Sequence, residues 1–165
     1  MFLELLRTHD VRLVADIRRI PKSSRHPHFS RDALDAALAE AGIAYQHLEA
    51  LGGMRQPRPG SVNGAWREAA FQGYADYLAT PPFQRALDHL IALSREHTVA
   101  AMCAEADPAS CHRQLLADAA LARGVDVIHL LAGGGFRSHS LTAHARVGDA
   151  SGLVTYPSLL DNAGE

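Results

Sequence analysis

The sequence contains little cysteine and no long apolar segment. Only two of its 165 residues are cysteine, Cys103 and Cys111, which is too few for a secreted disulfide scaffold and predicts free thiols. No apolar run approaches the roughly 20 residues needed to span a bilayer. The N-terminal stretch MFLELLRTHD carries acidic and basic residues too early for a signal peptide. We therefore expect a soluble, cytoplasmic protein with no membrane partner.

An excess of charge of either sign is also missing. The formal net charge of -2 at pH 7 excludes a uniformly basic nucleic-acid binder but not a local basic surface. One basic stretch lies between residues 16 and 31 and contains spaced cations with one aromatic residue: Arg18, Arg19, Lys22, Arg25, Phe29 and Arg31. This pattern is typical of a surface that contacts phosphate groups, and a solvated loop is the alternative interpretation.

Internal repeats, low-complexity tracts and interdomain linkers are absent as well. At 165 residues and 17.8 kDa, the chain has the size of one domain with a core of its own. Hydrophobic residues make up 47% and charged residues 21%, as in ordinary globular proteins. We expect residues 1–165 to form a single α/β domain whose tail is irregular from about residue 133.

Short apolar runs alternate with helical patterns along the chain. Strands are predicted at residues 11–17, 43–48, 98–103 and 125–131, and a further short strand at 152–157. Helices are predicted from residue 2, after Ser30 up to 41, and over 65–80, 81–97 and 112–123. Because a right-handed crossover places a helix between successive parallel strands, the fold class is α/β, with an open, mostly parallel, Rossmann-like sheet and flanking helices.

Two strand ends carry the candidate chemistry. Asp16, followed by Arg18 and Arg19, ends the first predicted strand, and Cys103 and Glu105 follow the third. Ligands of open α/β sheets bind beyond the carboxyl ends of the strands, so neighbouring strands would bring these groups to one cleft. The stretch CAEADPASCHRQ then leads into a helix. The free N–H groups at the start of that helix form an anion site that Arg113 can extend.

The two cysteines allow several interpretations. A thiol at Cys103, near a helix N-terminus and arginines, would have a lowered pKa and act as a nucleophile, whereas simple packing is the other interpretation. Cys103, Cys111 and His112 match no zinc knuckle and lack an obvious fourth ligand, so no metal or cofactor is expected. Position 109 is Ala, so the loop does not match the Cys-x5-Arg pattern of phosphatases. A reversible disulfide needs Cα atoms within about 7 Å.

Glu105 is the stronger acid–base candidate, and together with Asp16 it would provide two carboxylates in one pocket. The alternatives are that Glu105 is a capping or solvated acid near Arg113, and that Asp16 only holds an arginine by a bidentate pair.

The stretches LVADIRRIPKSSRHPHF, YQHLEALGG, FQGYADYLATPPF and AAMCAEADPASCHRQLLADAALARGVDVIHL resemble a bacterial and archaeal family, domain of unknown function 488, over residues 2–156. The matching motif positions are Asp16, Arg18, Pro21, Ser23, Phe29, Tyr45, Leu51, Gly52, Gly53, Phe71, Tyr74, Cys103, Glu105, Cys111, His112 and Arg113. The resemblance implies a compact, enzyme-like α/β fold without an established general activity. Members usually begin with a further strand that ends in a Gly-His-Ser type turn, which is lacking before Phe2 here, so a sheet edge or pocket is expected to differ.

The leading functional prediction is a hydrolase that acts on a nucleotide or nucleic acid at an N-glycosidic or phosphoester bond. Its predicted catalytic residues are Glu105, Asp16 and Cys103, and its predicted anion- or substrate-binding residues are Arg18, Arg19, Arg113, His112, Ser23, Tyr45 and Tyr74. One alternative is a non-catalytic module that binds nucleic acid or another anion through the basic stretch. The other is a thiol-dependent sulfurtransferase or redox protein that uses Cys103 and Cys111.

Overall fold

A three-stranded parallel sheet forms the centre of the fold in this computed structural model, which describes residues 1–160. Its strands are β1 (Leu13–Asp16), β2 (Ala44–His47) and β3 (Val99–Met102), in the order β2-β1-β3. All four residues of β1 are buried, as expected for the central strand of a parallel sheet that is covered on both faces.

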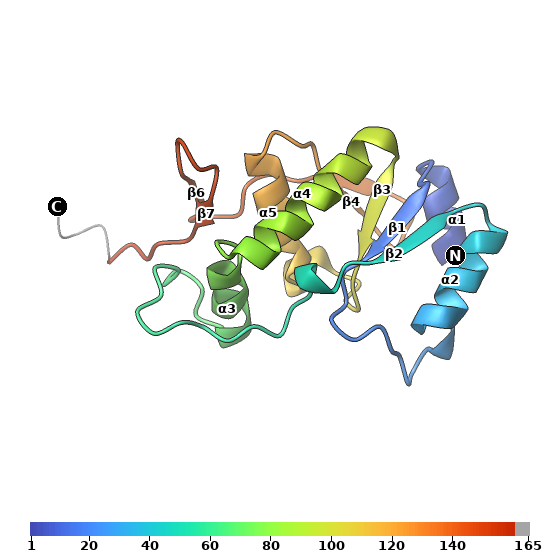
Figure 1. Ribbon diagram of the computed structural model, residues 1–165, viewed down its shortest axis with the longest axis horizontal. Coiled ribbons are helices and arrows are strands. Elements are labelled where there is room, and N and C mark those ends of the chain that lie inside the picture. Colours follow the sequence, from blue (N-terminus) through green and yellow to red (C-terminus); the bar gives the residue numbers. More distant parts are fainter. Residues whose placement is uncertain (161–165) are drawn as a thin grey trace.

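Five helices are present within residues 1–160: α1 (Phe2–Thr8), α2 (Arg31–Glu40), α3 (Ala69–Tyr77), α4 (Pro81–Glu96) and α5 (Arg113–Ala122). Helices α1 and α2 lie on one side of the strands, and α4 and α5 lie on the other (Figure 1). Two apolar clusters correspond to these two sides. One contains Leu6, Val14, Leu34 and Leu38, and the other contains Ile17 with residues of α3, α4 and α5. The α/β class predicted from the sequence is confirmed.

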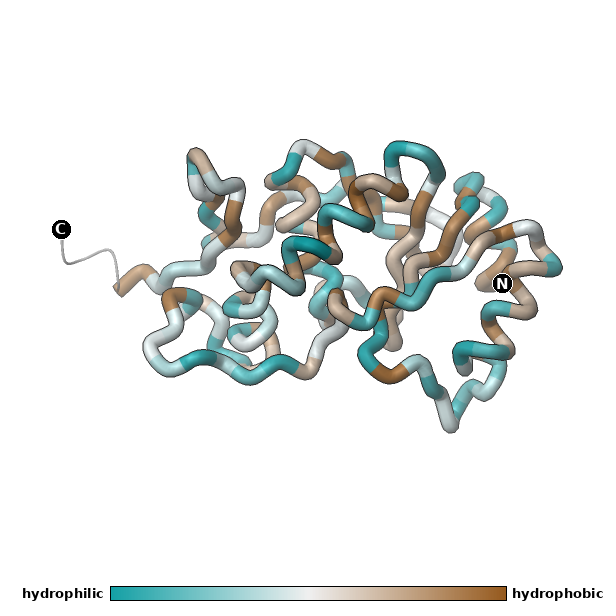
Figure 2. The backbone as a smooth tube through the Cα atoms, viewed as in Figure 1, coloured by the Kyte–Doolittle hydropathy of each residue, from teal (hydrophilic) through white to brown (hydrophobic). Residues whose placement is uncertain are grey.

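Local sequence explains where the best-defined helix begins and which face it buries. At the start of α4, the Thr80 side chain accepts a hydrogen bond from the N–H of Phe83, and prolines occupy the first two helical positions, where the missing N–H groups are not needed. Phe83, Leu87 and Ile91 are buried because their spacing puts them on one stripe of the helix. Figure 2 shows apolar segments gathered on the strands and polar segments on the connecting loops.

The region after α5 differs from the expected continuation of the parallel sheet. The strand predicted at 125–131 forms as β4 (Ile128–Leu130), but it pairs antiparallel with β5 (Phe136–Ser138) in a separate two-stranded sheet. A tight connection containing Gly134, at φ +88, lets β5 return beside β4, so the backbone hydrogen bonds of β4 go to β5 rather than to β3. The tail is therefore less irregular than expected.

Short elements complete the described residues. Strands β6 (Arg146–Val147) and β7 (Val154–Thr155) pair antiparallel, and β7 lies within the short strand predicted at 152–157. Three 3-10 turns are present, at Pro27–Phe29, Glu49–Leu51 and Pro108–Ser110. Within residues 1–160, every helix is too short or too polar to cross a membrane.

Candidate functional site

The carboxyl ends of β1 and β3 lie side by side. Asp16 is in register with Met102, and the N–H of Ile17 donates a 2.9 Å hydrogen bond to the Met102 carbonyl. Side chains alternate between the two faces of a strand. Met102 packs in the cluster under α1 and α2, whereas Ile17 and Cys103 pack in the cluster under α3 to α5. The two candidate groups thus share an edge of the sheet but point to opposite faces.

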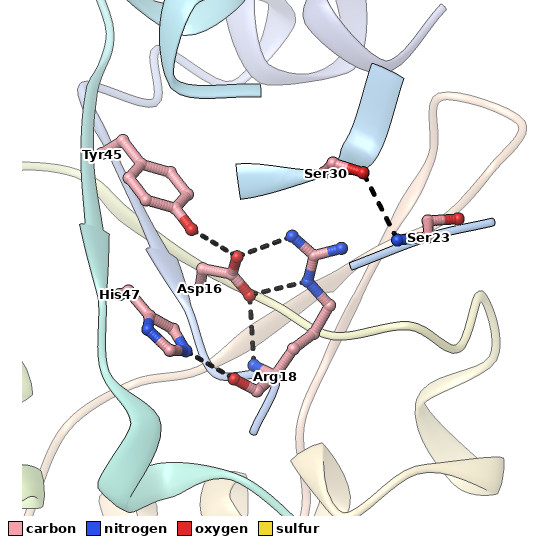
Figure 3. A network of polar contacts seen from close by, with 6 residues as sticks. All are labelled: Asp16, Arg18, Ser23, Ser30, Tyr45 and His47. Carbon is pink, nitrogen blue, oxygen red and sulfur yellow. Dashed lines mark hydrogen bonds and ion pairs between the residues drawn. The ribbon is translucent and has the colours of Figure 1, made fainter. Parts of the chain in front are cut away.

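On the α1 and α2 face, Asp16 is the centre of a buried ion-pair network (Figure 3). The Arg18 guanidinium donates to both carboxylate oxygens, from Nε at 2.9 Å and from Nη2 at 2.7 Å, and the Arg18 backbone N–H donates at 3.1 Å. Asp16 is fully buried and Arg18 is 7% exposed. Burial works to raise the pKa of Asp16, but the hydrogen bonds from Arg18 and Tyr45 outweigh it and lower that pKa. Asp16 thus engages two of the three guanidinium nitrogens of Arg18.

Neighbouring polar residues tie this network to β2 and to the basic stretch (Figure 3). The Tyr45 hydroxyl donates a 2.6 Å hydrogen bond to Asp16, and burial and the nearby carboxylate raise the pKa of Tyr45, which keeps the phenol a neutral donor. His47 Nε2 lies 2.7 Å from the Arg18 carbonyl. The Ser23 N–H donates to Ser30 Oγ at 3.5 Å. These contacts fix the start of the loop that follows β1.

The remaining cations of the basic stretch are solvent-exposed. Arg19, Lys22, Arg25 and Arg31 are exposed, and Arg19 Nη1 donates to the Met54 carbonyl at 2.8 Å. This arrangement leaves the stretch as a positively charged surface beside the carboxyl edge of the sheet.

On the opposite face, the two cysteines form a close dithiol. Cys103 Sγ lies 2.7 Å from Cys111 Sγ, and both thiols are free. The N–H of Glu105 donates to Cys103 Sγ at 3.3 Å, and the N–H of Arg113 donates to Cys111 Sγ at 3.4 Å. Cys111 is 4% exposed, whereas Cys103 is only partly buried.

The close contact separates the acidities of the two thiols. The hydrogen bond from Cys103, with contributions from His112 and the Arg113 N–H, lowers the pKa of Cys111 despite its burial. The same hydrogen bond, together with burial, raises the pKa of Cys103. The two titrations belong to the pair, so the first proton is lost readily and the remaining one is held between the sulfurs.

His112 and Arg113 surround the dithiol and keep unused donor capacity. His112 Nδ1 lies 3.6 Å from Cys111 Sγ, and the His112 ring packs against Tyr74 with centroids 4.8 Å apart. The Arg113 guanidinium donates to the Glu105 carbonyl. Buried His112 Nε2 and Arg113 Nε have no hydrogen-bond partner among the described residues. Both nitrogens are also sealed from solvent.

Tyr74 supports this side of the site from the core. Its hydroxyl donates to the Leu51 carbonyl at 2.8 Å, and burial raises its pKa well above the ordinary value, so it is a neutral buried phenol. Sequence reasoning assigned no role to Gly53, although a Cβ there would lie 3.0 Å from His112 Nδ1. Gly53 therefore leaves the space that the His112 ring occupies. In the sequence, the signal for this role was the Gly52-Gly53 pair in a loop rich in Gly, Pro and Arg.

Glu105 lies at the rim of the dithiol and is exposed. Its backbone binds Cys103 and Arg113. In the part of the chain that the structure describes, no hydrogen bond or ion pair joins Glu105 to Asp16, whose partners are Arg18 and Tyr45. The expected proximity of the two carboxylates is therefore not seen as a direct contact. No group of three or more His, Cys, Asp and Glu side chains within residues 1–160 is arranged to hold a metal ion.

Residues 1–120 match the model of a protein family described as domain of unknown function DUF488. The chain belongs to this family. The DUF488 match includes the Asp16 network, the dithiol and Arg113, and it ends inside α5, before β4 to β7. Comparison with curated proteins and with solved structures found no match.

Proposed function

We propose that Cys103 and Cys111 form a redox-active dithiol that exchanges with disulfide substrates. The 2.7 Å contact between the sulfurs carries this proposal, because a disulfide bond of about 2.0 Å is reached by a small movement. A sulfurtransferase, which shares the use of a cysteine thiolate, has no need for a second sulfur at this distance.

The two sulfurs differ in exposure and acidity and therefore have different roles in the exchange. Cys103 is the more accessible thiol, so it attacks the substrate disulfide after its proton passes across the short contact to Cys111. A mixed disulfide forms with Cys103 and one substrate thiolate leaves. Cys111 then loses its proton, attacks Cys103 Sγ and releases the second substrate thiol. The dithiol monoanion becomes a disulfide, and the substrate disulfide becomes two thiolates, one of which takes the proton released by Cys111 and the other a proton from solvent.

The surroundings favour the thiolate at each stage. Backbone N–H groups point at both sulfurs, and the nearby Arg113 guanidinium adds positive charge. The Arg113 guanidinium, which donates to the Glu105 carbonyl at the rim, would attract a departing thiolate or an anionic substrate.

The test uses glutathione disulfide with the reduced chain, followed by mass spectrometry and thiol counting. Because the chain has two cysteines, wild type should lose both thiols and release two glutathione molecules per chain. C111S should stop at one glutathione adduct on Cys103, because the second sulfur is missing. C103S should react far more slowly, because Cys111 is buried. Two thiols that survive glutathione disulfide at pH 7 would refute the proposal.

A hydrolase that acts on a nucleotide or nucleic acid is the second candidate, and the exposed carboxylate of Glu105 at the rim favours it. In this alternative Glu105 works as acid or base, Asp16 holds Arg18 in place, and the exposed cations Arg19, Lys22 and Arg25 bind phosphate groups. E105Q should then abolish phosphoester or N-glycoside cleavage while D16N reduces it indirectly. Full turnover by E105Q would exclude this assignment.

The same exposed cations would also serve a non-catalytic anion-binding module. A single-stranded oligonucleotide titrated at several salt concentrations separates the two, because contacts to phosphate weaken steeply with salt. Binding that is lost on replacing Arg19 and Arg25, with no turnover by the intact protein, would favour the module over the hydrolase.

A further inference from the structure

A chain of buried polar side chains links α5 to the region beyond it. Asp118 on α5 is fully buried and lies 2.7 Å from His139 Nε2, and His139 Nδ1 lies 2.8 Å from His129 Nε2 on β4. The Tyr156 hydroxyl donates to the other Asp118 oxygen at 2.6 Å, and the Thr142 N–H donates at 2.9 Å.

The hydrogen bonds fix which nitrogen is free. The Asp118 carboxylate accepts from Tyr156 and Thr142, so the His139 Nε2–H donates to it, and His139 Nδ1 must be an acceptor. His129 Nε2–H is then the donor to His139. His129 Nδ1 is left as an unprotonated nitrogen with no hydrogen-bond partner in the described residues, and it is not among the partnerless atoms that are sealed from solvent.

His129 lines a cavity of about 210 Å³ beside this chain. Arg137 lies opposite His129 in the β4–β5 pair, so the two side chains emerge on the same face of that small sheet. The other polar residues of the lining are Gln114, Ser138, His139 and Ser140. The cavity thus combines one guanidinium, one free imidazole nitrogen and several neutral hydrogen-bond donors.

The charges around His129 favour an anion over a cation. Burial is the main cause that lowers the pKa of His129, and the guanidinium charges of Arg137 and Arg113 add to it, while Asp118 acts in the opposite direction. Asp118 already accepts hydrogen bonds from Tyr156, Thr142 and His139. A bound anion would offset the guanidinium charges and allow His129 to accept a proton.

We propose that this cavity is a binding site for a small oxyanion, held by Arg137 and by His129 protonated on Nδ1, with Asp118 and His139 stabilising the added charge. The proton comes from solvent when the anion binds. When His129 Nδ1 is protonated, the proton on His129 Nε2 can move to His139 Nδ1. This transfer brings the positive charge closer to the buried Asp118 carboxylate.

The site is separate from the dithiol. Neither Cys103 nor Cys111 lines the cavity, and the inference does not rest on the proposed redox function. Asp118 lies inside the DUF488 match, whereas His129, Arg137 and His139 lie beyond it. The cavity is therefore assembled between the family domain and the region that follows it.

Calorimetric titration with inorganic sulfate tests the proposal, because sulfate keeps its charge throughout the working pH range and only the protein titrates. Runs at pH 7 in two buffers of different ionisation enthalpy give the number of protons taken up. Wild type should bind sulfate with uptake of close to one proton per ion, and uptake should fall at acidic pH, where His129 is already protonated. Acetate titrated in parallel distinguishes a planar carboxylate from a tetrahedral oxyanion.

Two variants separate the parts of the site. R137Q should weaken sulfate binding by about ten-fold or more, because a charge-assisted contact is lost, yet keep the proton uptake. H129Q retains an amide donor toward His139 but should abolish the uptake. H144N is the matched control, because His144 is exposed, lies outside the cavity lining, and has a φ of 66 that asparagine tolerates.

Unchanged affinity in R137Q would overturn the proposal, and so would binding by wild type without proton uptake. Because Arg137 is exposed, we expect R137Q to fold like wild type. R137Q therefore tests the proposal even if H129Q is destabilised. C111S should bind sulfate like wild type, and this result separates a failure of the oxyanion site from a failure of the dithiol.

Discussion

Replacing Asp16 with asparagine should strongly destabilise the fold. D16N keeps the size of the side chain but removes its charge, so the Arg18 guanidinium, which is 7% exposed, loses its bidentate ionic partner. Removing one member of a buried ion pair costs about 3–5 kcal/mol, because the other charge stays buried and unpaired. Both partners are almost completely buried, so solvent screening does not reduce this figure.

Urea unfolding at pH 7 and a thermal melt measure the effect. For a chain of this length, about 1 kcal/mol shifts Tm by roughly 2–4 °C, so D16N should lower Tm by about 6–20 °C. Y45F is the matched control, because it removes one hydrogen bond to the same carboxylate and keeps the ion pair, with an expected cost of about 1.5–3 kcal/mol. A D16N protein within about 0.5 kcal/mol of wild type would refute the reasoning.

The same network predicts how stability depends on pH. The pKa of Asp16 is lower in the folded state than its ordinary value, so the folded protein holds this proton more weakly than the unfolded chain does. Its contribution to stability is therefore fully present above the ordinary pKa of an aspartate and is lost as pH falls through the lowered folded value. D16N should remove this acid-dependent part, and its unfolding free energy should change less between pH 5 and pH 3 than that of wild type.

D16N also tests the division of the sheet edge into two faces. Because Asp16 and Cys103 point to opposite faces, a folded D16N protein should keep the wild-type rate of thiol alkylation by iodoacetamide at pH 6. A large loss of thiol reactivity in a variant that is still folded would show that the two sites are electrostatically coupled.

Three further predictions concern the dithiol and the tail. G53A should displace the His112 ring, since a Cβ there meets Nδ1 at 3.0 Å, and should slow alkylation at pH 6, while G133A, at an open position, should leave the rate unchanged. E105Q should leave the rate of oxidation by glutathione disulfide within about two-fold of wild type, because only its backbone contacts sulfur; a larger change would assign the carboxylate a role in thiol chemistry. Y156F should cost about 1.5–3 kcal/mol in urea unfolding, because it removes a buried hydrogen bond to a carboxylate, and an unaffected midpoint would contradict that bond.

Much of the fold followed from periodicity. The β1, β2 and β3 strands and the α2, α4 and α5 helices lie within one or two residues of the expected ranges, because each has a clear apolar pattern and the helices also have Ser30, Thr80 or Gly124 near a boundary. The partner of β4 was not predictable in this way. An apolar run fits a buried parallel strand and a hairpin strand equally well, and the choice depends on long-range pairing with β5.

The sequence predicted that the candidate site lies at the carboxyl edge of the sheet, but it did not predict how the side chains are arranged there. Asp16 and Cys103 were expected at the ends of two strands, without a decision on whether these strands are neighbours, and the register of β1 with β3 shows that they are. The expectation of one shared pocket did not take into account that side chains alternate between the two faces of a strand. A difference of one residue in register places a side chain on the opposite face of the sheet. The 2.7 Å contact between the thiols could not be predicted, because it depends on how the Pro108–Ser110 turn brings the chain back to β3.

The two faces are nevertheless joined through one backbone link. The Asp16 network fixes the end of β1, and the next residue, Ile17, donates its N–H to the Met102 carbonyl, one residue before Cys103. Ile17 is fully buried beside Cys103 in the cluster that contains α5. This backbone hydrogen bond therefore joins the strand end that carries Asp16 to the strand end that precedes Cys103. Motif residues near both strand ends thus lie one backbone hydrogen bond apart but face opposite sides of the sheet.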